Sequence, residues 1–242
     1  MKHKEHYNDQ YILELSSKLS SVMPHFDSEA FSNDLIGQLD DKELFARFDC
    51  IVDAMQKNMD SDYSKNILAF YDILGPELTQ PEGMFNFGWW LWPIGRYVER
   101  YGNENWKVSL LFLKELTKRF TGEYAIRPLL KEHPKEVMDE LILWTHDDNV
   151  HVRRLASEGV RLRLPWAQKL SVALEEFDRY VEILTNLKDD PEKFVQKSVG
   201  NNLNDLFKDA PEKAEYIITQ WRKTPTSKAQ EWIIKHGMRN QK

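Results

Sequence analysis

Cysteine is almost absent from this 242-residue sequence. With Cys50 as its one cysteine, the chain cannot form an intramolecular disulfide or a CxxC metal site, which fits a reducing compartment. Long apolar runs are missing too: the longest, around residues 84–94, contains Gly88 and Pro93 and is too short to span a bilayer. The N-terminal residues lack the apolar centre of a signal peptide. We therefore expect a cytoplasmic protein that does not associate with membranes.

The sequence also lacks the motifs of several large enzyme classes. It contains no Gly-rich phosphate loop, no nucleophile elbow and no HExxH, which removes most support for nucleotide hydrolysis, serine esterase and zincin chemistry. His146 and His151 flank Asp147 and Asp148 and could be imagined as a metal cluster. The same residues are ordinary in a turn that opens a helix with an Asp cap. We therefore expect no metal and no other cofactor.

Basic residues are scarce in the first part of the chain. The formal net charge of the whole chain is −6, which argues mildly against general nucleic-acid binding. Residues 1–100, however, contain 9 Lys and Arg against 17 Asp and Glu, while residues 101–242 contain 24 against 22. The net charges of the two parts are −8 and +2, so an anionic ligand should bind the C-terminal part.

Apolar side chains recur at the 3.6-residue helical period along almost the whole sequence, which predicts an all-α fold. The segment Asp147–Arg154 has the pattern of a turn that opens the inner helix of a HEAT-type repeat, and Asp189–Val199 repeats it with one extra residue. Val152 and Val195 then correspond at a spacing of 43 residues, which is typical of HEAT and armadillo units. We expect an α-solenoid of HEAT-like helical repeats whose inner helices line a concave face.

The repeat register and the loops complete this prediction. The register places Glu158 opposite Asn201, with Asp205 one turn beyond. We expect a single domain over residues 1–242, with a possible internal boundary in the Gly- and Pro-rich loop near residues 75–83. The dense aromatic run at residues 85–92 could stack on bases, but packing in the core or against the next repeat is the favoured interpretation.

The segment His151–Trp166 concentrates basic residues around a single acid, Glu158. The four arginines are Arg153, Arg154, Arg161 and Arg163. The simplest explanation is a solvated helix face with weak ion pairs at i,i+4 spacing, such as Glu123 with Arg127 or Arg154 with Glu158.

Four ordered motifs resemble the AlkC-type 3-methyladenine DNA glycosylases, a family of HEAT-like repeat proteins. The motifs are Arg119–Pro128, His151–Trp166, Ser198–Asp205 and Glu231–His236. Together with Trp92-Pro93 and Tyr97–Gly102, these motifs extend the resemblance over nearly the whole chain. The form of the family that it resembles is the one without the immunoglobulin-like domain that some members append. Val160 and Leu162 depart from the Thr and Pro that are usual in the family.

The resemblance implies a function and site residues. Members of the family excise cationic alkylated bases such as 3-methyladenine, and also 3-methylcytosine, from duplex DNA without flipping the base, unlike most glycosylases. Glu123, Glu158 and Asp205 match the active-site acids of the family, and Trp166 matches the aromatic residue that packs against the lesion nucleotide. The implied partner is double-stranded DNA containing alkylated bases, bound on the concave face by a monomer.

Basic side chains near these motifs are the expected contacts to DNA phosphates, which position a duplex without reading its sequence. They are Arg127, Arg153, Arg154, Arg161, Arg163, Lys188 and Lys197. A carboxylate can stabilise a cationic sugar or orient water onto it, and Glu123 or Asp205 can fill either role. No Schiff-base lysine stands in the motifs, so we expect a monofunctional enzyme. The rival hypotheses are a catalytically silent HEAT-repeat protein that binds distorted DNA, and a protein scaffold.

Overall fold

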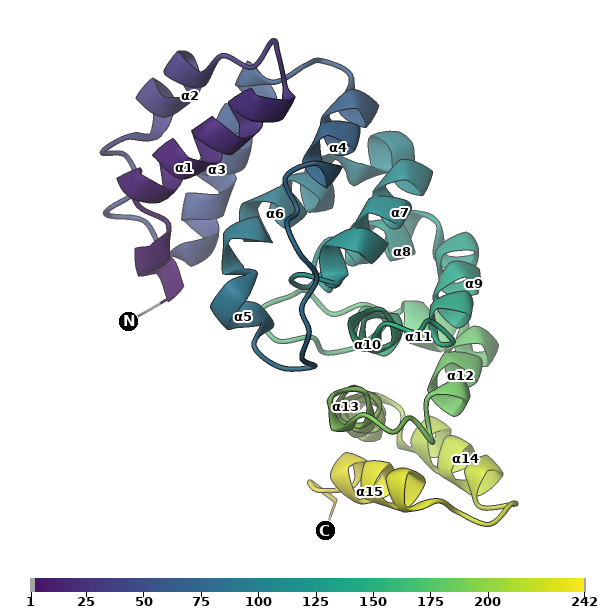
Figure 1. Cartoon of the computed structure of the whole chain (residues 1–242). Coiled ribbons are helices and arrows are strands. Elements are labelled where there is room, and N and C mark those ends of the chain that lie inside the picture. Colours follow the sequence, from purple (N-terminus) through teal and green to yellow (C-terminus); the bar gives the residue numbers. More distant parts are fainter. Residues whose placement is uncertain (1–2, 242) are drawn as a thin grey trace. The chain divides into compact units, whose positions relative to one another are not determined.

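The fold consists of helices joined by loops. Figure 1 shows a computed structural model of the protein, which describes residues 3–241. Every regular element in that stretch is an α-helix or a short 3₁₀ helix, so the predicted all-α class is confirmed. The α-helices are α1 (Asp9–Val22), α2 (Ser28–Leu35), α3 (Leu44–Asn58), α4 (Tyr63–Tyr71), α5 (Met84–Phe87), α6 (Trp92–Tyr101), α7 (Trp106–Thr117), α8 (Ile126–Glu132), α9 (Pro134–Trp144), α10 (Val150–Glu158), α11 (Val172–Glu175), α12 (Phe177–Asn186), α13 (Lys193–Asp209), α14 (Pro211–Trp221) and α15 (Lys228–Gly237). The 3₁₀ helices are η1 (His3–His6), η2 (Trp89–Leu91) and η3 (Gly102–Asn105).

The chain forms two compact units. Unit 1 takes the residues through Leu78 together with Gly83–Thr121, and unit 2 takes Thr79–Glu82 and the residues from Gly122 on. The organisation as one domain, with a boundary near residues 75–83, stays a prediction. None of the described helices is long and apolar enough to cross a membrane.

Unit 1 has an aromatic core. Trp92, at the start of α6, is buried, and its ring centre lies 5.1 Å from that of Phe48 on α3 and 5.4 Å from that of Phe120. Phe87, from the same aromatic run, is 71% exposed. The core interpretation of this run is therefore confirmed for Trp92 and wrong for Phe87.

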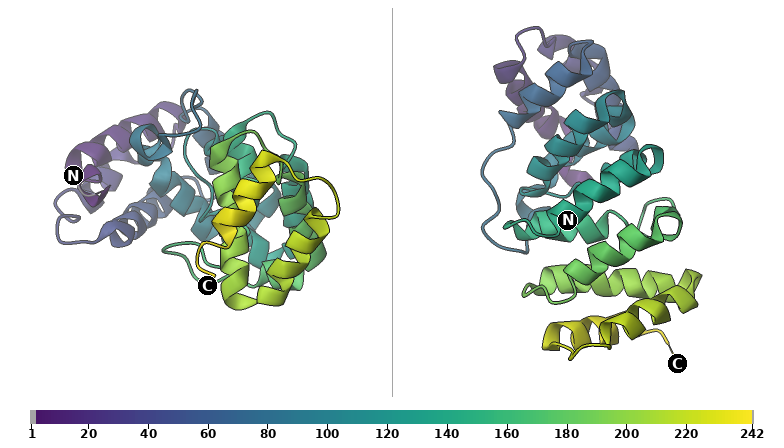
Figure 2. Two further views of the ribbon diagram at one scale, coloured as in Figure 1. Left: turned by 90° about the horizontal axis from the view of Figure 1, so that it is seen from below. Right: turned by 90° about the vertical axis from the view of Figure 1, so that its right-hand side faces the viewer.

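Unit 2 is built from helices stacked in two layers. In Figure 1, α10, α13 and α15 form one layer, and α9, α12 and α14 form the other. α9 packs on α8, α10 and α12, while α13 packs on α10, α14 and α15. The right-hand view of Figure 2 shows the helices of this unit one above the next, from teal to yellow. This is the stacked arrangement of helix pairs that the 43-residue period predicts.

The two repeat copies share the turn that opens their inner helices. Asp147 accepts a hydrogen bond from the backbone N–H of Asn149 at 2.9 Å, just before α10. Asp190, 43 residues later, accepts one from the backbone N–H of Glu192 at 2.9 Å, just before α13. An Asp side chain that bonds the backbone two residues on stabilises a tight turn. The aspartate therefore recurs because the turn recurs.

Helices α13 and α15 approach each other closely at two glycines. A Cβ atom on Gly200 would lie 2.8 Å from Cδ2 of His236, and one on Gly237 would lie 2.6 Å from Cβ of Leu203. Because glycine alone lacks a Cβ, these positions permit a contact that any other residue would obstruct. The contact brings side chains of α15 against the inner helix of the second repeat copy.

Candidate active site

The three acids singled out in the sequence are all buried in unit 2. Glu123 lies in the turn before α8, Glu158 ends α10, and Asp205 lies on α13. These residues are 5%, 5% and 3% exposed, respectively. Charged groups are almost never buried this far unless they are paired, so their partners define the site.

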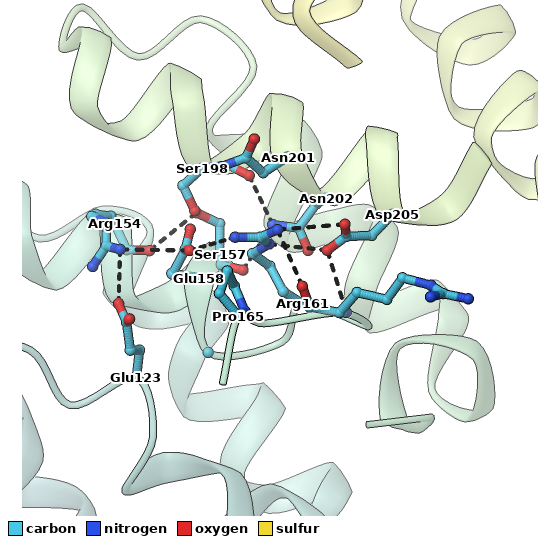
Figure 3. Close-up of polar contacts among 12 residues, drawn as sticks. Glu123, Arg154, Ser157, Glu158, Arg161, Pro165, Ser198, Asn201, Asn202 and Asp205 are labelled. Atoms are coloured by element: carbon cyan, nitrogen blue, oxygen red, sulfur yellow. Dashed lines mark hydrogen bonds and ion pairs between the residues drawn. The ribbon is translucent and has the colours of Figure 1, made fainter. Parts of the chain in front are cut away.

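Arg154 joins the first two acids (Figure 3). Its Nη2 donates to Oε2 of Glu123 at 2.7 Å and lies 3.5 Å from Oε1 of Glu158. The guanidinium also lies over the ring of Phe194, with Cζ 4.7 Å from the ring centre. The i,i+4 ion pair of Arg154 with Glu158 is therefore confirmed, but the closer partner is an acid 31 residues away.

Arg161 joins the second and third acids. Its Nη1 donates to Oε1 of Glu158 at 2.8 Å, while Nε and Nη2 donate to the two oxygens of Asp205 at 3.0 and 3.4 Å. A guanidinium that donates two bonds to one carboxylate fixes its orientation. We call the resulting series the acid–arginine chain: Glu123, Arg154, Glu158, Arg161 and Asp205. With three carboxylates and two guanidiniums, its formal charge is −1.

The pairing fixes charge states within the acid–arginine chain. Burial raises the pKa of the Glu158 carboxyl, but Arg154 and Arg161 outweigh this effect and hold the pKa below its ordinary value. Burial lowers the pKa of both guanidiniums, and the neighbouring carboxylates outweigh it and raise the pKa. Glu158 and both arginines are therefore charged near neutral pH.

Polar contacts behind the acids lock α10 against α13. Ser157 donates its hydroxyl to Oγ of Ser198 at 2.7 Å, and Asn202 donates from Nδ2 to the carbonyl of Ser157 at 2.8 Å. Tyr180 on α12 donates its hydroxyl to Oδ1 of Asn202 at 3.0 Å. Sequence reasoning missed these residues, although the i,i+4 spacing of Ser198 and Asn202 on an otherwise apolar helix face was a usable signal.

Trp166 is 69% exposed and has a φ of 63°. Bulky side chains seldom adopt positive φ, and such backbone conformations cluster at ligand sites. Tyr124 steadies the loop by donating its hydroxyl to the carbonyl of Pro165 at 3.4 Å. The exposure excludes a core role for Trp166 and leaves its side chain available to a ligand.

Arg127, expected among the DNA contacts, is buried beneath the same loop. Its Nη1 donates to the carbonyls of Gly159 at 3.2 Å and Arg161 at 2.9 Å, and its Nη2 donates to that of Gln168 at 2.6 Å. The guanidinium therefore anchors the loop of residues 159–168 and does not lie at the surface.

Arg153, expected as a phosphate contact, ties the two repeat turns together. Its Nε donates to Oδ2 of Asp190 at 2.6 Å, and its Nη1 donates to the carbonyls of Asp147 and Asp148, both at 2.9 Å. Gln196 occupies the corresponding position 43 residues later and donates to the carbonyl of Asp190 at 2.7 Å. Both copies therefore use this position to hold their turn. The phosphate contact expected of Arg153 stays a prediction, and these bonds offer a structural role as the alternative.

The other expected DNA contacts divide between the interior and the surface. Arg154 and Arg161 are buried in the acid–arginine chain. Arg163 is exposed and pairs with Asp209, with Nη2 2.6 Å from Oδ1. Lys188 pairs with its neighbour Asp189, and Lys197 is exposed and has no hydrogen bond or ion pair within residues 3–241. Arg163, Lys188 and Lys197 are thus the expected contacts that a duplex can reach.

The conceivable metal cluster is not assembled. Among the residues that the structure describes, no group of three or more His, Cys, Asp or Glu side chains is placed to hold a metal ion. His151 is buried, with Nε2 3.1 Å from the carbonyl oxygen of Gln80.

The fold and this site define a helical-repeat protein with a buried acid–arginine chain, and the chain is similar to known proteins. Residues 121–239 match the family described as DNA alkylation repair enzyme. The solved structure of the alkylpurine DNA glycosylase AlkC from Pseudomonas fluorescens, bound to DNA containing an abasic site analog, is 31% identical with a TM-score of 0.83. The match covers 99% of the present chain and 64% of the AlkC chain. The protein YhaZ of Bacillus subtilis (strain 168) is 32% identical over 237 residues, which are 98% of this chain and 63% of YhaZ.

Residues 121–239, which hold all three acids, are thus the part of the chain that matches the DNA alkylation repair enzyme family. The similarity to AlkC confirms the HEAT-like helical repeat fold. The chain spans just under two thirds of the length of each of these two relatives.

Proposed function

We propose that the protein is a monofunctional DNA glycosylase that hydrolyses the N-glycosidic bond of cationic alkylated bases in duplex DNA without flipping the base. Its substrates are 3-methyladenine and 3-methylcytosine. The observation that carries the proposal is the acid–arginine chain, a buried series with a formal charge of −1. The family match and the similarity to an alkylpurine DNA glycosylase support the same reaction.

The chemistry suits carboxylates that are held in place. Alkylation at N3 makes the base a cation and a good leaving group, so no strong general acid is needed. The deoxyribose becomes positively charged as the bond lengthens, and a preorganised negative charge stabilises that state. Arg154 and Arg161 hold the acids in a fixed orientation before the reaction begins.

The positions of the acids suggest a division of roles. Glu158 lies between two arginines, so its charge is the most fully compensated. Glu123 and Asp205 lie at the ends of the acid–arginine chain, each beside one of its arginines. We assign the stabilisation of the sugar and the orientation of water to Glu123 and Asp205, and the fixing of both arginines to Glu158.

Trp166 accounts for recognition without base flipping. Its exposed ring lies on the loop that follows Arg161, which is part of the acid–arginine chain. An aromatic face attracts a cationic base or sugar, so the lesion nucleotide can be held at the protein surface while its base stays stacked.

Defined duplexes carrying one 3-methyladenine or one 3-methylcytosine test the proposal. We expect release of the free base and an abasic strand that breaks only after alkali treatment, with no adduct trapped by borohydride. Tight binding of abasic DNA without base release would support the silent DNA-binding alternative instead. Absence of both activities would favour the protein scaffold.

A further inference from the structure

A row of side chains extends along α13 from the acid–arginine chain to the surface. Its members are Lys193, Lys197, Asn201 and Asp205, at successive i+4 positions. Residues at this spacing lie beside one another on a helix. Asp205 is buried, whereas Lys193 and Lys197 are exposed. The row therefore connects the candidate active site with a cationic surface.

Helix α15 and the turn after it add two more basic groups at Asn201. The Oδ1 atom of Asn201 lies 3.1 Å from Nε2 of His236 and accepts a hydrogen bond from Nη2 of Arg239 at 3.1 Å. The His236 ring stacks on Trp232, with ring centres 4.9 Å apart, and Nζ of Lys193 lies 3.7 Å from the centre of the Trp232 ring. We call Lys193, Lys197, His236 and Arg239 the α13–α15 basic cluster.

Carboxylates do not neutralise this cluster. Within residues 3–241, none of its four members forms an ion pair with Asp or Glu; Lys193 bonds the side-chain oxygen of Gln196, and Arg239 bonds the carbonyl of His236. Arg153, Arg154 and Arg161 differ, because each of them pairs with an acid. The pKa of His236 is lowered, first by its partial burial and then by the charges of Arg239, Lys197 and Lys193. The contribution of these three charges reflects a positive potential around His236.

We propose that the α13–α15 basic cluster binds a backbone phosphate of the DNA duplex, a few nucleotides from the lesion. The choice of DNA as the source of the phosphate rests on the proposed function. Unpaired Lys and Arg side chains at the surface are the groups that hold DNA phosphates. Lys197 and Asp205 are eight residues apart, about 12 Å along an α-helix. Base pairs are spaced at about 3.4 Å along the duplex axis, so the phosphate lies within about four nucleotides of the sugar that Asp205 faces.

The first test measures the salt dependence of binding to a duplex with a central abasic-site analogue, which requires no catalysis. Lys197→Ala and Arg239→Ala should each reduce the log–log salt slope, and the double variant should reduce it by about 0.9 and weaken binding roughly eight-fold at 0.1 M salt. Lys223→Ala is the matched control, because Lys223 is exposed and follows α14 in the other layer. Slopes equal to that of the control would overturn the proposal, provided that thermal melts match.

The second test locates the phosphate. A single neutral methylphosphonate, moved over the four nucleotides next to the lesion, should weaken binding of the unaltered protein at one position. It should cause no further loss in the Lys197→Ala, Arg239→Ala double variant, because the phosphate and the cations form one contact. Additive losses would overturn the assignment. Losses that are the same at every methylphosphonate position would also overturn it, because they would be expected of a site that binds free phosphate.

The outcomes separate this inference from the proposed function. Base release together with unchanged salt slopes refutes the phosphate contact at the α13–α15 basic cluster and leaves the proposed function standing. Reduced slopes without base release refute the glycosylase and leave the phosphate contact standing. A protein that binds no duplex refutes both.

Discussion

At the scale of single residues, the exposure of Trp166 decides how its substitution should behave. The side chain is 69% exposed, so Trp166→Ala should leave the melting temperature nearly unchanged. Stacking of a base on an aromatic ring contributes roughly 1–3 kcal/mol, so excision should fall about 5- to 150-fold. Trp166→Phe keeps an aromatic face and should retain most activity. Equal losses in excision and in binding of undamaged DNA would show that Trp166 does not recognise the lesion.

The charge of Glu158 should make the stability of the folded protein depend on pH. Its pKa is lowered in the folded protein, so its contribution to stability is present above the unfolded pKa, near 4.5, and is lost as the pH falls through the folded value. Glu158→Gln should therefore lower the melting temperature most at neutral pH, and the difference from the unaltered protein should shrink in acid. Melts between pH 7 and the acid transition check this. A difference that is constant with pH would assign the loss to packing alone.

At the scale of structural elements, Arg153 makes the clearest contrast between two roles. Removing it leaves the buried carboxylate of Asp190 without its partner, which should destabilise the protein by roughly 3 kcal/mol. The salt slope of duplex binding should stay unchanged, in contrast to Lys197→Ala. Arg153→Gln should recover part of the stability, because Gln196 makes the equivalent bond to a carbonyl in the next copy.

Denaturant unfolding and salt-dependent binding of these variants provide the two readouts. The Arg153→Ala, Asp190→Asn double variant should lose less stability than the sum of the single losses, since both changes remove one contact. A flattened salt slope in Arg153→Ala with unchanged stability would support the phosphate contact and contradict the structural role.

The elements also show what the sequence could and could not predict. The helical period and the 43-residue repeat are local patterns, and they predicted both the all-α class and the paired turns at Asp147 and Asp190. The three acids were found through their motifs. The bonding partners of Arg127 and Arg153 could not be found from the sequence, because a count of charges does not reveal which donors already bond carbonyls or buried acids. Those partners lie up to 41 residues away and become neighbours only through the packing of helices.

At the scale of the whole molecule, positive and negative charges are distributed unevenly along the chain. Residues 101–242 carry a net charge of +2 in a chain of −6, and they contain both the buried acid–arginine chain and the α13–α15 basic cluster. Cations at the surface favour the DNA backbone, while the buried excess of carboxylate favours a cationic base and sugar. The central claim is that this buried charge drives catalysis.

Single-turnover release of 3-methyladenine by Glu123→Gln and Asp205→Asn tests that claim most directly. Each change keeps the shape of the side chain and removes one negative charge, so each rate should fall roughly 10²–10³-fold, the scale of one lost preorganised transition-state contact. The double variant should lose less than the product of the single losses, because the acids act as a unit. Thermal melts identify variants that merely fail to fold. Near-normal rates in both folded single variants would contradict the catalytic role of the acid–arginine chain.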